Sequence, residues 1–562
     1  MTGALTKLED LRASASPAVK TLNDQPSLDP KRVLSVYKNL GIASVDELRE
    51  RLDTGDIERL FGSRTAQHVR QGLTEAHAIL LYKADDLRLA LEEYLLNRCG
   101  VQRAEAAGDY RRRVEVVEEL VFVVEANDFP SVVAHVERYG GRTPLITSGE
   151  DHALFSMSSG VLLRLQRASR DDWGIHMVSC TGSKAHLKQL NELAGTLRPG
   201  KSGEIAVPTE ATFYRGLGLQ YIEPELREGG DEIERAARNA LPRPVNKEDF
   251  LGDLHAHTRS SDGVSSIEEM AEAAKTLGYE YVGITDHSQS LKIARGVPAS
   301  ALLDQIRQID KLNGRLRNFQ VLKSSEVDIL QDGSLDYPDE ILRELDYTVC
   351  SIHSRFGLGK REQTDRILRA MGNPFFNILG HATGRLLLKR PGYEVDMDRI
   401  NERARQNGCC FEINSSPDRL DLSAEHARHA TEAGVMIAVS TDAHSTGEFG
   451  LIRCGIDQAR RAGLEKAGLL NCQPLAKLRR HLWSFPRRCG MRRGSQERVP
   501  SFGHAPSRST KPVSSTGRQH DPLIPPNFGP AARLDDQSSA RFLRYIGFSK
   551  ISVLNCLTAA AA

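Results

Sequence analysis

Between residues 248 and 470 the chain alternates strand-like and helix-like runs, and this regular alternation constrains its fold more than any other feature. Alternating βα units predict a largely parallel sheet, either open or closed into a barrel. Strand-like runs occupy residues 281–285, 347–352, 375–379, 410–414 and 435–440, and helix-like runs occupy residues 266–277, 299–313, 396–407 and 424–433.

Metal-ligand residue types are concentrated in the same region, which holds eight of the 17 histidines within residues 251–450. Several directly follow a strand-like run, and residues just past the carboxyl ends of parallel strands converge on one face. In His255-x-His257 and Asp442-x-His444 the two side chains of each pair point to the same side of an extended segment. The segments concerned are residues 253–257, 261–263, 284–287, 325–328, 351–354, 380–381 and 440–444.

The mixture of five or six imidazoles and three carboxylates exceeds what one tetrahedral metal site needs. It predicts two or three divalent metal ions, with Mn, Zn and Fe as the candidates. Such clusters activate water and hold both oxygens of an in-line phosphoryl displacement, so phosphoester hydrolysis is the expected chemistry. A single histidine after a strand is more often a loop or core residue, but five ordered segments are hard to explain by packing. His426 and His429 lie on a helix-like run without a carboxylate partner, and we interpret them as surface residues.

Four motifs in this region are Gly252-Asp-Leu-His-Ala-His257, Ser261-Asp-Gly263, Ile284-Thr-Asp-His-Ser288 and Ser440-Thr-Asp-Ala-His444. Over roughly residues 248–475 they resemble the polymerase-and-histidinol-phosphatase (PHP) family of metal-dependent phosphoesterases. The resemblance implies a distorted (β/α) barrel with a trinuclear metal site. The family's ligands carry over to nine residues of the expected types, namely His255, His257, Asp262, His287, Glu326, His353, His381, Asp442 and His444.

Other segments resemble the bacterial family X DNA polymerases, in which hairpin-helix elements and a polymerase palm precede the PHP domain. They are residues 26–75, 108–113, 181–184, 209–228, 332–339 and 380–385. Strand-like runs at 116–124, 144–148 and 161–165 and a helix-like run at 83–96 agree with an α+β palm. The resemblance implies a multidomain chain with a helical hairpin-helix region (1–80), a palm-like domain (81–200), a linker (201–247) and the PHP barrel (248–475). Residues 485–562, rich in Pro, Ser, Gly and Arg, are interpreted as a basic tail from their composition.

The palm-like domain departs from that family at its metal-binding positions. A polymerase palm needs three aspartates to hold two Mg²⁺ ions, and the resemblance puts these positions at Glu119, Val121 and Leu163. Valine and leucine offer no oxygen ligand, and Glu119 alone cannot hold two ions. The polymerase reaction is therefore predicted to be absent or severely crippled.

Contacts with DNA are predicted to be weakened as well. Hairpins that bind DNA phosphates use glycines so that backbone N–H groups can approach closely, and here Asp29 stands where a glycine is expected. Arg355 and Arg385 are candidate phosphate clamps, because arginine binds phosphate oxygens in pairs, with a structural ion pair as the alternative for both. The candidate DNA contacts are Lys31, Arg32, Arg111, Arg112 and Arg113, although exposed arginines are more often simply solvated.

The composition limits which partners, which cellular location and which cysteine chemistry the protein is expected to have. Lys+Arg is 75 and Asp+Glu is 74, so the chain lacks a strongly basic overall balance and only a local basic face could bind nucleic acid. No run approaches the length of a membrane span, and the first ten residues lack the plan of a signal peptide. Nine cysteines without a CxxC pair argue against disulfides and favour the cytoplasm. The tail is expected to be disordered, with a nucleic-acid-binding arm and a shifted reading frame as alternatives.

The ligand cluster predicts phosphodiester hydrolysis, and the resemblance implies that this is 3′→5′ exonuclease activity on DNA in DNA repair, with cleavage at abasic sites as a further activity. One alternative is a phosphomonoesterase for a small metabolite, similar to histidinol phosphatases. Another is a DNA-binding protein that keeps a polymerase-like architecture without polymerising. The sequence leaves the oligomeric state open.

Overall fold

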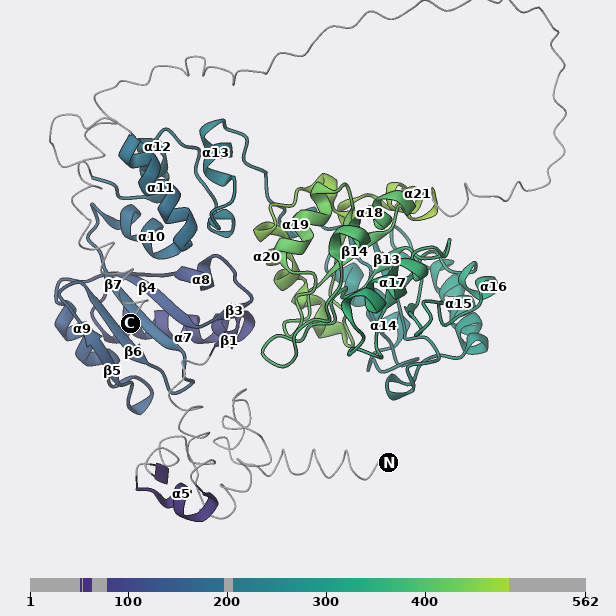
Figure 1. Ribbon diagram of the computed structural model, residues 1–562, viewed down its shortest axis with the longest axis horizontal. Coiled ribbons are helices and arrows are strands. Elements are labelled where there is room, and N and C mark those ends of the chain that lie inside the picture. Colours follow the sequence, from purple (N-terminus) through teal and green to yellow (C-terminus); the bar gives the residue numbers. More distant parts are fainter. Residues whose placement is uncertain (1–50, 53, 63–77, 197–205, 485–562) are drawn as a thin grey trace, which may run out of the picture.

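A computed structural model describes residues 51–52, 54–62, 78–196 and 206–484 of the 562-residue chain. Figure 1 shows the N-terminal sheet with a helical layer beside it, and a larger α/β unit packed next to both. Most of the expected hairpin-helix region, including Lys31 and Arg32, and the tail at 485–562 lie outside the described residues. The first described helix is α5 (Asp56–Phe61).

A five-stranded mixed sheet with strand order β2-β4-β7-β6-β5 forms the N-terminal unit. Only β4 and β7 run parallel, and their register pairs Glu119 with Leu162 and Val121 with Arg164. The strands predicted at 116–124, 144–148 and 161–165 and the helix predicted at 83–96 are confirmed. The elements are β1 (Ile79–Leu80), α7 (Leu81–Arg98), β2 (Arg103–Ala107), α8 (Gly108–Arg111), β3 (Val116–Val117), β4 (Glu119–Glu125), α9 (Phe129–Val136), β5 (Leu145–Ser148), β6 (His152–Ser156) and β7 (Leu162–Arg167).

A helical layer with its own small core follows this sheet. Buried side chains such as Val178, Phe213 and Ile222 form that core, because apolar residues recur on one face of each short helix. Trp173 and Met177 of the first helix instead pack on the sheet against Val121. The helices are α10 (Trp173–Thr181), α11 (Lys184–Thr196), α12 (Glu210–Gly216) and α13 (Glu232–Ala237).

The large C-terminal unit contains two parallel sheets, with strand orders β10-β9-β8 and β11-β12-β13-β14-β15. Isolated bridges pair Ala256 with Ala443 and His287 with Glu326, so the sheets also meet where the strands end. The parallel sheet predicted from the βα alternation is therefore present. Its strands are β8 (Gly252–Asp253), β9 (Tyr281–Ile284), β10 (Gln320–Lys323), β11 (Glu326–Asp328), β12 (Val349–Ser351), β13 (Ile378–Leu379), β14 (Cys410–Asn414) and β15 (Ile437–Ser440).

Helices cover these sheets, and local signals define where they begin and end. Ser266 and Glu269 form a reciprocal capping box at the start of α14, and Gly408 ends α18 at a φ of 68° that favours glycine. All four helices predicted here are confirmed to within a few residues. The helices are α14 (Ile267–Thr276), α15 (Ala299–Asn313), α16 (Asp339–Leu342), α17 (Lys360–Ala370), α18 (Met397–Asn407), α19 (Ala424–Glu432), α20 (Ile452–Arg461) and α21 (Leu475–Ser484).

One glycine permits a close approach inside this unit. A Cβ on Gly283 of β9 would lie 1.7 Å from the Tyr347 hydroxyl oxygen, so no larger residue fits there. That hydroxyl donates a hydrogen bond of 2.7 Å to the Leu254 carbonyl, next to the first candidate metal ligand. The packing therefore fixes the backbone that enters the candidate site.

Ion pairs join the N-terminal unit to the C-terminal unit. Arg113, after α8, lies 2.9 Å from Asp85 of α7 and 2.7 Å from Asp457 of α20. Arg453 of α20 also pairs with Asp85. The side chains of Arg113, Asp85 and Asp457 are largely buried, so each charge must be neutralised by its ion-pair partner and not by water. Further pairs across the junction are Arg385–Glu115, Arg460–Glu225 and Arg461–Glu228.

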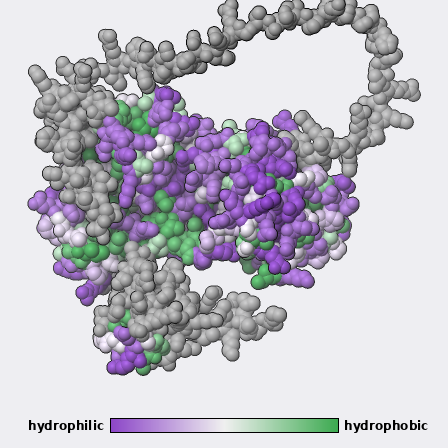
Figure 2. All heavy atoms as spheres, in the orientation of Figure 1, coloured by the Kyte–Doolittle hydropathy of each residue, from purple (hydrophilic) through white to green (hydrophobic). Residues whose placement is uncertain are grey.

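The face drawn in Figure 2 is mostly hydrophilic over the described residues, with smaller hydrophobic areas. Among these residues, no helix is both long enough and apolar enough to cross a membrane.

We predict that Arg113→Ala lowers the free energy of unfolding by about 3 kcal/mol, because it leaves the Asp457 carboxylate buried without its cation. Urea unfolding followed by circular dichroism measures the change. The control is Arg238→Ala, whose exposed pairing with Glu234 contributes at most about 0.5 kcal/mol. Equal stability of the two variants would contradict the structural role of Arg113.

Candidate metal centre

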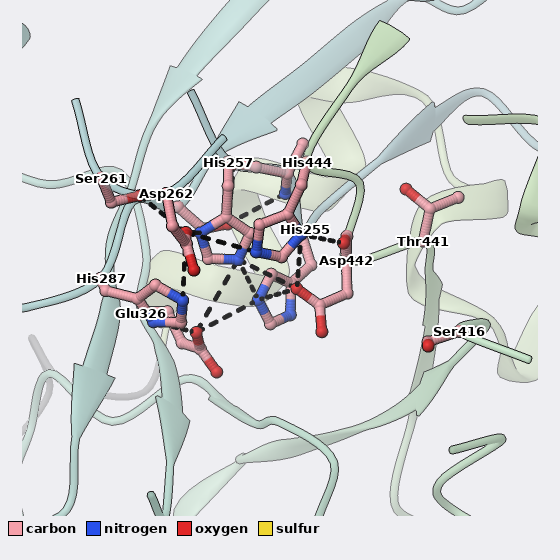
Figure 3. A network of polar contacts seen from close by, with 12 residues as sticks. His255, His257, Ser261, Asp262, His287, Glu326, Ser416, Thr441, Asp442 and His444 are labelled. Carbon is pink, nitrogen blue, oxygen red and sulfur yellow. Dashed lines mark hydrogen bonds and ion pairs between the residues drawn. The ribbon is translucent and has the colours of Figure 1, made fainter. Parts of the chain in front are cut away.

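The ends of the parallel strands bring all nine candidate metal ligands into one cluster. His255 and His257 follow β8, His287 follows β9, and Glu326 begins β11. In Figure 3 the side chains of His255, His257, His287, Glu326 and Asp442 point toward one another. The others come from the loops after β8, β12, β13 and β15, namely Asp262, His353, His381 and His444.

Glu326 lies at the centre of the cluster, with its side chain 1% exposed. One carboxylate oxygen is 2.7 Å from His287 Nδ1, and the other is 2.8 Å from His381 Nε2 and 3.3 Å from His353 Nε2. His255 Nε2 and His257 Nε2 lie 3.6 Å and 3.8 Å from the first oxygen. A single carboxylate is thus shared by five imidazoles.

Eight of the nine residues fall into three groups whose ligand atoms lie within 4.8 Å of one another. Asp442 Oδ1 is 3.0 Å from His257 Nε2, and Asp262 Oδ1 is 3.3 Å from His444 Nε2. His381 joins the cluster through Glu326. The groups are His257–Asp262–His287–His444, His255–His257–Asp442 and His287–Glu326–His353.

The electrostatics of the cluster favour bound cations. Burial opposes charging, but Glu326 and Asp262 raise the pKa of His287 to about 10. Burial likewise opposes charging of the Glu326 carboxyl, yet the neighbouring imidazoles hold its pKa well below the usual range. Burial and the nearby His287 lower the pKa of His257 to about 4. His257 is therefore held in the neutral form that binds a metal, whereas His287 must release its proton when a cation binds.

Several buried polar atoms of the cluster fit a metal better than a hydrogen bond. His257 Nδ1 and His381 Nδ1 are buried without a hydrogen-bond partner in the described part of the chain. Glu326 Oε2 and His287 Nδ1 lie 2.7 Å apart, yet neither has hydrogen-bond geometry. Unpaired buried groups are costly, and divalent cations would satisfy them. The imidazole and carboxylate donors suit Zn, Mn or Fe.

The structure reveals a buried residue that the sequence interpretation missed. Glu412 of β14 is fully buried, and its Oε1 lies 2.7 Å from His255 Nδ1. Its Oε2 accepts a hydrogen bond of 2.9 Å from the His381 backbone N–H. Glu412 therefore orients one candidate ligand through its ring and another through its backbone. The available signal was the polar pair Glu412 and Asn414, two residues apart in an otherwise apolar strand.

Other carboxylates around the cluster hold the ligand segments. Asp328 lies 2.5 Å from His353 Nδ1. Asp286 accepts hydrogen bonds from Thr258 and Ser261, on the segment that carries His257 and Asp262. These contacts set the ring and loop orientations that coordination requires.

The two arginines proposed as phosphate clamps lie in different environments. Arg355 is exposed two residues after His353, with a left-handed φ of 58°. The Arg385 side chain is mostly buried and donates to the Arg419 and Leu420 carbonyls. It also pairs with Glu115 of the N-terminal unit at 3.2 Å. Arg355 is thus available to a substrate, whereas Arg385 makes the structural ion pair that was its alternative role.

Among the three polymerase positions, Glu119 on β4 is the one that carries an acid. Glu119 pairs with Arg164 of β7 at 2.9 Å, and Val121 is buried against Trp173 and Met177. The strand register corrects the third position, because Leu163 points into the opposite core and Leu162 lies beside Glu119. Of the three positions that should carry metal-binding acids, one is thus a carboxylate paired with an arginine and the other two are apolar.

The three arginines proposed to touch DNA make contacts within the protein. Arg111 forms a bidentate pair with Glu210, at 2.7 Å and 2.6 Å. Arg112 donates to the Thr181 carbonyl at 2.7 Å and pairs with Asp109 at 2.6 Å. Arg113 joins the two units, as described above. In this arrangement none of the three presents a free guanidinium to DNA.

Comparisons with known proteins agree with the site. The PHP domain family model matches residues 253–416. "DNA polymerase/3'-5' exonuclease PolX" of Bacillus subtilis (strain 168) is 34% identical over 494 residues, which cover 84% of this chain and 86% of that protein. A "Probable phosphatase" of Thermoanaerobacter sp. (strain X514) is 29% identical over 42% of this chain and 96% of its own length. Another, from Acetivibrio thermocellus, is 29% identical over 36% of this chain and 82% of its own length.

The parallel sheets, the His/Asp/Glu clusters and the matched family define a PHP-type, metal-dependent hydrolase. The similarity extends well beyond that domain. The chain belongs to the bacterial family X DNA polymerases that carry a PHP domain.

We predict that Glu412→Gln weakens binding of Mn²⁺ by about 10–100-fold, because the His255 ring loses the carboxylate that orients it. Titration calorimetry on metal-stripped protein measures the affinity. Glu425→Gln, an exposed change on α19, is the matched control and should bind like the unaltered protein. Unchanged affinity in Glu412→Gln, with unchanged circular dichroism, would show that Glu412 does not support the metal centre.

Proposed function

We propose that this protein is a metal-dependent 3′→5′ exonuclease acting on DNA in DNA repair, and that it no longer polymerises. The observation that carries this proposal is the cluster of nine ligand-type residues. In the same chain, two of the three polymerase positions lack an acid, and Glu119 is paired with Arg164. A relative covering most of the chain bears the name polymerase/3'-5' exonuclease, which supports DNA as the substrate. Residues 81–200 would form a degenerate palm and residues 248–475 a distorted PHP barrel, with the bridges between the two sheets supporting the barrel.

The residues of the site supply distinct parts of the hydrolysis. Bound divalent ions would lower the pKa of a coordinated water and hold the phosphate oxygens. Glu326, Asp442 and Asp262 balance the positive charge gathered there, and burial strengthens that balance. Arg355, exposed after His353, can bind a phosphate oxygen of the strand. Cleavage at abasic sites would use the same centre.

A second candidate is a phosphomonoesterase for a small metabolite. Proteins named probable phosphatases match 36–42% of this chain, which corresponds to 82–96% of their own length. They support hydrolysis at the same centre without a role for the N-terminal unit. Substrate length separates the two candidates.

With Mn²⁺, the purified protein is expected to release nucleotides from a 3′-labelled single strand. His255→Ala/His257→Ala should reduce the rate by at least about 1,000-fold, since it removes ligands from two of the metal groups. Electrophoresis of the products measures the rate, and chelation with EDTA should abolish it. Hydrolysis confined to small phosphate esters would overturn the exonuclease proposal and favour the second candidate.

The nuclease-inactive variant also tests the loss of polymerisation. His255→Ala/His257→Ala is expected to add no nucleotide to a primed template with Mg²⁺ or Mn²⁺, because Glu119 is paired with Arg164 and Val121 offers no oxygen ligand. Extension of a labelled primer measures incorporation without interference from degradation. Nucleotide addition by this variant would contradict the loss of the palm chemistry.

A further inference from the structure

The loop at residues 288–297, which follows His287, is fixed to the metal centre at its base. The Val297 backbone N–H donates to the His287 carbonyl at 2.8 Å. Ser290 Oγ donates to the Asp328 carboxylate, whose other oxygen lies 2.5 Å from His353 Nδ1. The loop therefore contacts one candidate ligand, His287, directly and a second, His353, through Asp328.

The tip of this loop is closed on itself. The backbone N–H groups of Ala294 and Gly296 both donate to the Leu291 carbonyl, at 3.1 Å and 3.0 Å. A Cβ on Gly296 would lie 2.0 Å from the Ser288 carbonyl oxygen, so the neck of the loop requires glycine. Such a loop presents its tip in a fixed position and loses little conformational entropy on binding.

The tip exposes two cations and an apolar side chain. Lys292, Ile293 and Arg295 are all exposed, and Ile293 is 93% exposed. Arg295 adopts a left-handed φ of 56°, which a non-glycine residue adopts at a cost. Neither cation makes an ion pair within the described residues. These three side chains therefore contribute little to the stability of the fold.

Exposed apolar residues are concentrated around the mouth of the metal centre. Within described residues 248–484, four large apolar side chains are exposed. Three of them, Val264, Ile293 and Leu388, lie in the loops that carry Asp262, His287 and His381, and only Leu277 lies elsewhere. Single exposed apolar residues are common, but their concentration beside one site marks a binding surface.

We propose that the loop tip formed by Lys292, Ile293 and Arg295 binds the nucleic-acid strand next to the cleaved phosphate. Lys292 and Arg295 pair with backbone phosphates, and Ile293 packs against an unstacked base. This inference rests on the proposed exonuclease function and specifies a single-stranded 3′ end, because an unpaired base offers its face to an apolar side chain without the cost of unstacking a duplex. The charge of the tip complements phosphates, which favours a nucleic acid over a protein partner.

The test compares the tip with matched changes at the other end of the domain. The tip variants are Ile293→Ala and Lys292→Ala/Arg295→Ala. The controls are Leu277→Ala and Lys311→Ala/Arg315→Ala, which alter exposed residues where α14 and α15 lead into the amino ends of strands. For each protein, kcat/KM with Mn²⁺ is measured on a single-stranded oligonucleotide over a range of salt concentrations and on bis(p-nitrophenyl) phosphate.

Each tip variant is expected to lose about tenfold in kcat/KM on the oligonucleotide and to keep its activity on the small ester. Removing two phosphate contacts should also make the salt slope of log kcat/KM shallower by about 1.4, from about 0.7 per single-strand contact. The controls should match the unaltered protein on both substrates.

Three outcomes would overturn the proposal. Tip variants that cleave the oligonucleotide like the controls would show that the tip does not bind the strand, while leaving the exonuclease function intact. An equal loss on both substrates would mean that the loop only supports the metal centre. Failure of the unaltered protein to cleave the oligonucleotide would reject the exonuclease function, and the tip proposal with it.

Discussion

The buried Glu326 carboxylate is the interaction on which the C-terminal unit depends. A carboxylate that is 1% exposed must be compensated, and five imidazoles from the ends of different strands surround it. The bridge between His287 and Glu326 also joins the two parallel sheets. The same contacts therefore close the fold and concentrate ligand atoms, which explains why metal-ligand types recur at successive strand ends.

The charges of the N-terminal unit serve a different purpose. Arg111 and Arg113 hold helices together and join the unit to α20, while Glu119 is paired with Arg164. Arg111, Arg112 and Arg113, which were predicted to contact DNA, are therefore occupied by partners within the protein. At the mouth of the metal centre, in contrast, Arg355 and the tip residues Lys292 and Arg295 are exposed.

Local sequence was sufficient where a signal lies within a few residues. The helix-like run at 266–277 located α14, and the strand-like run at 116–124 located β4. Several short elements were missed, such as β8 and β11, because two or three residues carry no readable period. Leu163 was assigned to the wrong face because alternation in a strand makes an error of one residue reverse every side chain.

The sequence by itself determined the chemistry of this protein, because the ligand residue types, with their i, i+2 spacing, directly follow strands that the sequence predicts. Tertiary structure alone decided which side chains support that chemistry. Glu412 contacts His255, which lies 157 residues away in the sequence. Arg385 forms an ion pair with Glu115 and is therefore not free to bind a substrate. Long-range partners are set by packing between strands and units, and no local pattern encodes them.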